Sequence, residues 1–159
     1  MKNQELMLKA QEQTLENRRI EMLDNIAVRV SSEDAVKNYY ELMNCDWTDY
    51  ADFNRKYGSE NNLESTGKRV SRYHSYNRMG MMMRRGLVDV DELYDLMGPG
   101  VVFFWEKYKP IVKETRRRTS GPDYCRDMEY CAVEMLKFMQ SKDPSFRIPK
   151  TLTRYDPNK

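Results

Sequence analysis

Histidine and cysteine are scarce in this chain of 159 residues. His74 is the single histidine, which excludes a histidine-rich zinc site. The three cysteines, Cys45, Cys125 and Cys131, contain no Cys-x-x-Cys pair, and their odd number does not define a disulfide framework. Free cysteine packs as a small apolar residue. We therefore expect buried free thiols, a cytoplasmic protein, and neither a metal nor a cofactor.

Long apolar runs are also missing. The longest covers residues 101–105, far below the roughly 20 residues that a transmembrane helix needs. The first ten residues lack the apolar segment of a secretory signal. The chain has neither a phosphate-binding glycine motif nor a Gly-x-Ser-x-Gly elbow. These absences predict no membrane span and give no support to the common nucleotide-binding and hydrolase classes.

The charged residues nearly balance, but they are unevenly distributed. Lys and Arg total 27 and Asp and Glu total 25, so the chain is not a highly basic, histone-like protein. The stretch 65–87 nevertheless has no acid and six bases: Lys68, Arg69, Arg72, Arg78, Arg84 and Arg85. Acidic stretches precede and follow it. We favour pairing of this basic helix with acidic neighbours inside the chain, with a nucleic-acid-binding surface as the alternative.

Apolar spacing predicts an all-α fold, because no segment alternates apolar and polar residues as a half-buried strand does. We expect about six helices in an irregular bundle around a long central helix, about 63–85. The helices from 89 to 141 should pack against that central helix. We expect Asp46 to cap a short helix at 47–57, and Asp89 with Glu92 three residues later to form a capping box for another. The last helix should cover 123–141. The predicted organisation is an N-terminal arm (1–30), a helical domain (31–141) and an extended tail (142–159).

The first helix carries a sparse apolar stripe. Leu8, Leu15 and Met22 stand seven residues apart, while the partner positions of a coiled-coil seam are polar. A helix with so weak a stripe does not fold stably by itself. We therefore predict that residues 1–22 dock onto a protein partner or onto a second copy of the chain, which would form a homo-oligomer.

Three further features each leave two interpretations open. Asn77, with Tyr94 and Trp105, predicts either a structural polar contact or a small-ligand pocket. The methionines at 79–83 predict core packing around Gly80, where a neighbouring helix can approach closely, or an adaptable binding surface. The segment 146–152 either wraps over its own domain or serves as an extended recognition peptide.

Several of these residues resemble the pattern of an uncharacterised family of small prokaryotic helical proteins, a domain of unknown function. The resemblance lies in Gly86-Leu87-Val88-Asp89, Tyr94, Trp105-Glu106, Pro110 and Arg116, and upstream in Trp47, Phe53 and Lys56-Tyr57-Gly58, with Glu129-Tyr130 near the end. It covers roughly residues 20 to 140 and implies a helical domain without an assigned activity. Some relatives carry a membrane-spanning N-terminal segment, whereas the matching segment here is charged, so no membrane tether is expected.

Together these patterns predict a non-catalytic helical protein–protein interaction or scaffold module that self-associates or docks through its N-terminal helix. One alternative is a nucleic-acid-associated regulatory protein that uses the basic helix 68–85. A second alternative is a small-ligand sensor with a pocket near Asn77, Tyr94 and Trp105.

Overall fold

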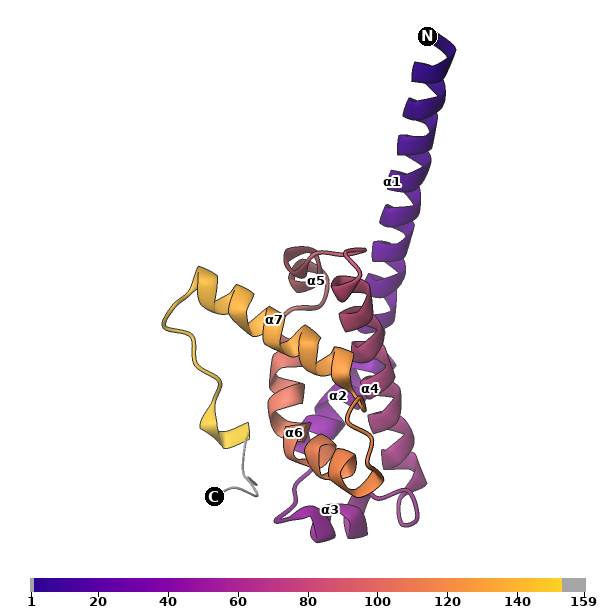
Figure 1. Cartoon of the computed structure of the whole chain (residues 1–159). Coiled ribbons are helices and arrows are strands. Elements are labelled where there is room, and N and C mark those ends of the chain that lie inside the picture. Colours follow the sequence, from indigo (N-terminus) through magenta and orange to yellow (C-terminus); the bar gives the residue numbers. More distant parts are fainter. Residues whose placement is uncertain (1, 153–159) are drawn as a thin grey trace.

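The computed structural model describes residues 2–152, and every regular element in that range is helical. The all-α prediction is therefore confirmed (Figure 1). Seven α-helices form within this range, close to the six or so expected. The elements are α1 (Lys2–Ser31), α2 (Glu33–Asn44), α3 (Tyr50–Tyr57), α4 (Leu63–Arg84), α5 (Val90–Met97), α6 (Gly100–Thr119), α7 (Arg126–Lys142) and the 3-10 helix η1 (Lys150–Leu152).

The central contact of the fold joins α4 to the start of α7. A Cβ added to Gly80 would lie 1.8 Å from the backbone oxygen of Asp127, so only glycine permits this approach. One turn earlier, the Asn77 side-chain oxygen accepts a hydrogen bond from the Met128 backbone N–H at 2.8 Å. One turn later, the Arg84 guanidinium donates to the Asp127 carboxylate at 2.9 Å. One face of α4 thus holds the N-terminus of α7, as the sequence predicted at Gly80.

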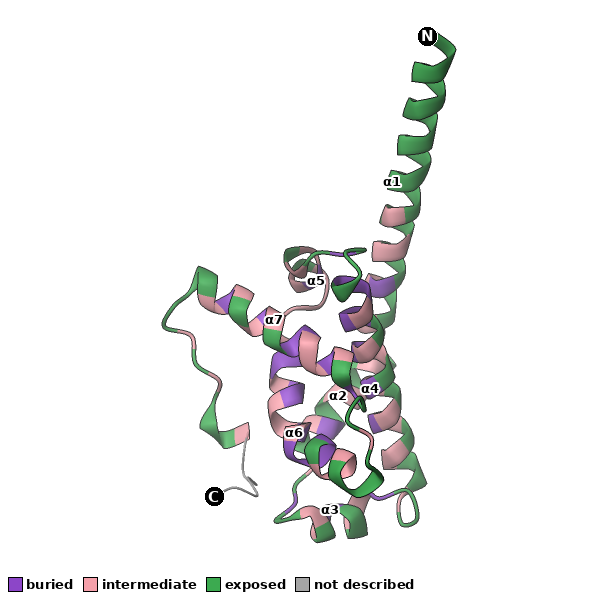
Figure 2. Ribbon diagram, in the orientation of Figure 1, coloured by how far each residue is buried: buried purple, intermediate pink, exposed green. Residues whose placement is uncertain are grey.

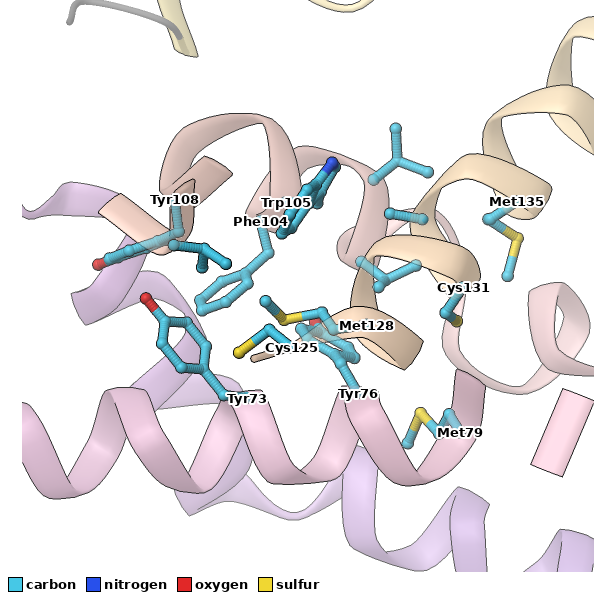
Figure 3. Close-up of a cluster of buried hydrophobic side chains, with 14 of the residues drawn as sticks. Tyr73, Tyr76, Met79, Phe104, Trp105, Tyr108, Cys125, Met128, Cys131 and Met135 are labelled. Carbon is cyan, nitrogen blue, oxygen red and sulfur yellow. The ribbon is translucent and has the colours of Figure 1, made fainter. Parts of the chain in front are cut away.

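Aromatic side chains complete the core between α4, α6 and α7 (Figure 3). Phe104 and Tyr108 of α6 stack at 4.6 Å between ring centroids, and Phe104 lies 5.3 Å from Tyr76 of α4. The Tyr108 hydroxyl donates to the backbone oxygen of Leu42 at 2.6 Å, which ties α2 to the same core. Aromatic pairs of this kind add about 0.5–1.5 kcal/mol each beyond the area they bury. The ring cluster therefore couples four helices.

α5 was expected against the central helix, but it packs mainly on other helices. The chain leaves α4 through Gly86, whose φ of +70° suits glycine, and α5 then packs against α1 and α7. Leu93 of α5 is fully buried, and the ring of Tyr94 lies 5.4 Å from that of Phe138 on α7. The reversal at Gly86 carries the next helix away from α4, so α5 reaches the core from the side of α1.

Two helix starts also differ from the expected positions. The helix expected from Trp47 begins at Tyr50, because Asp49 rather than Asp46 caps it by accepting from the Asp52 backbone N–H at 2.8 Å. The last helix was expected from Asp123 and begins at Arg126. Cys125 has a φ of +57°, a left-handed conformation that a helix cannot continue through, so it separates the preceding turn from α7.

The C-terminal segment folds back on its own domain as far as Leu152. Phe146 and Ile148 pack against the core, and the ring of Phe146 lies 6.4 Å from that of Phe103 on α6. The 3-10 helix η1 also rests on α6. Of the two interpretations of the tail, wrapping is therefore the one observed for 146–152. The tail from 153 onward lies outside the described residues.

We expect the two helical glycines of α4 to respond oppositely to alanine. Gly80→Ala forces a Cβ into the α7 backbone and should destabilise the protein by about 1–3 kcal/mol or more. Gly67→Ala meets nothing within 4 Å and should stabilise by roughly 0.5–1 kcal/mol through helix propensity. Urea unfolding measures both. Two substitutions of equal effect would show that α7 does not approach α4 this closely.

Candidate functional site

The first half of α1 projects from the body of the molecule (Figure 1). Every residue from 2 to 18 is exposed, and we name this segment the arm (Figure 2). Its large apolar side chains are more than half exposed, with Leu8 at 59% and Leu15 at 64%. Leu6 and Met7 are exposed to a similar extent. The arm therefore presents apolar side chains that no other part of the described chain covers.

The second half of α1 belongs to the body. Arg19 donates a hydrogen bond to the carboxylate of Glu92 on α5, and this contact lowers the pKa of Glu92. The Glu92 carboxylate also accepts from the Asp89 backbone N–H at 2.9 Å, which completes the capping of α5 predicted from the sequence. Met22 is half-buried against the core, and Ile26 is buried. Of the three residues predicted to bind a partner, Met22 is therefore mainly a packing residue.

A groove of about 920 Å³ runs between α1, α2 and α4. Its floor is apolar and consists of Met22, Ile26, Met79 and Met82. The charged residues that line it are five bases and a single acid, namely Arg18, Arg29, Lys68, Arg72 and Arg78 with Glu21. The exposed His74 also lies on its wall. The groove therefore combines an apolar base with a cationic rim.

Most of the basic helix is paired within the chain. Lys68 contacts Glu41 at 2.5 Å and Glu64 at 2.8 Å, and Arg84 contacts Asp127. The buried Arg69 donates to the Tyr57 backbone oxygen at 2.9 Å and lies over the Phe53 ring, while Arg72 donates to the Ala35 backbone oxygen at 2.6 Å. Arg78 and Arg85 are exposed and form no side-chain hydrogen bond or ion pair within residues 2–152. Contacts within the chain thus account for four of the six bases, two with carboxylates and two with backbone oxygens.

The three residues of the predicted ligand pocket each have a structural partner. Asn77 caps α7, Tyr94 packs on Phe138, and Trp105 is buried with the Arg116 guanidinium 5.9 Å from its ring centroid. Other residues line the groove, and others again line a second cavity of about 320 Å³ beside Tyr39 and Phe103 in the described part of the chain. The geometry therefore favours the structural interpretation of Asn77 over a small-ligand pocket.

The cysteines are free thiols in the described chain. Burial raises the pKa of Cys125 to about 11 and that of Cys131 to about 12, so both remain protonated at neutral pH. A protonated thiol is neither a strong nucleophile nor a metal ligand. Within residues 2–152, no three side chains of His, Cys, Asp or Glu gather as a metal site. The cysteines here act as core residues.

Sequence reasoning missed the groove because its two walls come from segments about 50 residues apart. The signal was present in α1, where Arg18, Met22, Asn25 and Arg29 are separated by four, three and four residues and so share one helical face. Only the apolar stripe of this helix was predicted to form a binding surface, so its basic face was overlooked. Which side of α4 remains open beside it depends on where α7 packs, which no local pattern encodes.

The residues that carried the family resemblance meet in the structure. Arg116 of α6 donates to the Tyr124 backbone oxygen and pairs with Glu129 of α7 at 2.8 Å, beside Trp105. Trp47 packs on Phe53 with ring centroids 5.0 Å apart. These contacts define a small all-α domain held by aromatic and arginine contacts between helices.

The chain belongs to the family described as a domain of unknown function, DUF4760, whose model matches residues 10–135. The match includes the C-terminal part of the arm, the groove and all the helices from α2 to α6. No curated protein and no solved structure matches the chain. Among the helices of the described chain, none combines the length and apolar character needed to cross a bilayer.

Substitution of Asn77 separates its structural role from a ligand-binding role. Asn77→Ala removes the acceptor for the Met128 N–H and should destabilise the protein by about 0.5–2 kcal/mol, the usual cost of losing a helix cap. Asn77→Asp keeps the acceptor oxygen and places a negative charge at a helix N-terminus, so we expect near-native stability. Urea unfolding midpoints test both. Equal losses in the two variants would contradict the capping role.

Proposed function

We propose that this protein is a non-catalytic helical interaction module that self-associates through its arm. The observation that carries the proposal is the exposure of Leu6, Met7, Leu8 and Leu15 on a helix that extends beyond its last contact with the body. Apolar side chains gathered in this way on a soluble surface are typical of binding sites. A helix of this length without packing partners is marginal in water, so contact with a partner stabilises it.

We also propose a reducing compartment, the cytoplasm, as the place of action. The three cysteines support this placement, since each is an unpaired thiol in the structure. Cys125 and Cys131 are buried, and Cys45 is partly buried. A secreted domain of this size would more commonly use such residues in disulfides.

The double substitution Leu8→Gln and Leu15→Gln tests the proposed function. Both side chains are exposed, so the body should keep its fold and melting temperature. We expect light scattering on a sizing column to give a mass of twice 19.1 kDa or more for the unaltered protein and 19.1 kDa for the variant. The physical reason is loss of the apolar area that the arm buries on association.

Val28→Gln is the matched control, because Val28 is 63% exposed on the same helix but lies outside the arm. It should leave the mass unchanged. An unaltered protein that stays at 19.1 kDa at all accessible concentrations would contradict self-association, as would an oligomer that survives both substitutions in the arm.

A further inference from the structure

We propose that the groove between α1, α2 and α4 receives the arm of a second copy of the chain, and that the exchange is reciprocal. This inference rests on the proposed function and names the surface on which the arm docks. Each copy would then insert residues 2–18 into its partner and receive the partner's arm in return. One contact repeated twice about a two-fold axis gives a closed dimer.

The arm cannot fill the groove of its own chain. α1 is one continuous helix from Lys2 to Ser31, and residues 2–31 contain neither glycine nor proline at which it could turn back. The base of the helix already lines the groove of its own chain through Met22 and Ile26, while the arm points away from the body (Figure 1). Any arm in the groove therefore comes from another molecule.

Charge complementarity favours the arm as the occupant. The groove is lined by five bases and one acid. The arm as a whole, residues 2–18, contains three acids and three bases, so its fit to the groove depends on where the acids lie on the helix. Glu5 stands three residues before Leu8, and Glu12 stands between Leu8 and Leu15 at helical spacing, so these acids flank the apolar stripe. Lys9 lies about 100° from Leu8 around the helix. An arm that faces the apolar floor with its leucines thus brings carboxylates to the cationic rim.

The length of the arm and the symmetry of a dimer also favour the arm as the occupant of the groove. The arm is roughly 25 Å long at 1.5 Å per residue, and the part of α4 that lines the groove, 68–82, is roughly 21 Å long. Leu8 and Leu15 continue the stripe that reaches the groove floor at Met22, seven residues further on. Two antiparallel α1 helices that meet along this stripe therefore place each arm beside the other copy's groove.

A charge exchange between two full-length variants tests the inference. The arm variant is Glu5→Lys with Glu12→Lys, and the groove variant is Arg29→Glu with Arg78→Glu; all four residues are exposed. Either variant alone should associate at least about tenfold more weakly than the unaltered protein, because like charges meet at both contacts. A one-to-one mixture should recover association, since the basic arm meets the acidic groove and the acidic arm meets the basic groove. Sedimentation velocity with one labelled variant measures each case.

Lys113→Glu with Lys137→Glu is the matched control, because it changes the net charge equally at exposed positions that do not line the groove. It should associate like the unaltered protein, and circular dichroism should show all variants folded.

If the groove variant dimerises normally while Leu8→Gln with Leu15→Gln does not, the arm docks elsewhere and only this inference fails. If the unaltered protein is a monomer, the proposed function fails with it. Salt-sensitive binding of a single-stranded oligonucleotide that the groove variant loses and the arm variant keeps would also overturn the inference.

Discussion

The approach of α7 to α4 at Gly80 is the constraint on which the rest of the fold depends. A backbone oxygen occupies the space where a side chain would begin, and Asn77 and Arg84 hold the same helix end from the turns on either side. With α7 fixed there, its buried face closes the aromatic core beneath α6. Because α7 covers one side of α4, the opposite side of that helix stays open and becomes the wall of the cationic groove.

The two halves of α1 differ in what covers them, although they form one uninterrupted helix. The contact from Arg19 to Glu92 and the packing of Ile26 fix the base, and the absence of any helix-breaking residue transmits that orientation to the arm. The arm therefore displays, at a set angle, exposed leucines with the carboxylates of Glu5 and Glu12 beside them. In our proposal, the arm of one copy binds the groove that the base of α1 lines in the other copy.

Much of this architecture was readable from local patterns. Helical spacing predicted the all-α fold, Gly80 predicted a close helix approach, and the Asp89–Glu92 spacing predicted a capped α5. The errors came from choices that local patterns do not decide. Asp46 and Asp49 are equally good cap types, and residue type alone does not select between them. The direction of the chain after α4, and hence the position of α5 and the open groove, depends on contacts between distant segments.

Hydrogen exchange measured across a range of protein concentrations shows whether the arm depends on a partner to remain helical. We predict that amides in the arm, 2–18, become protected as concentration rises, while the amides of the α4–α7 core stay protected throughout. An arm that exchanges at the same fast rate at every concentration would contradict it.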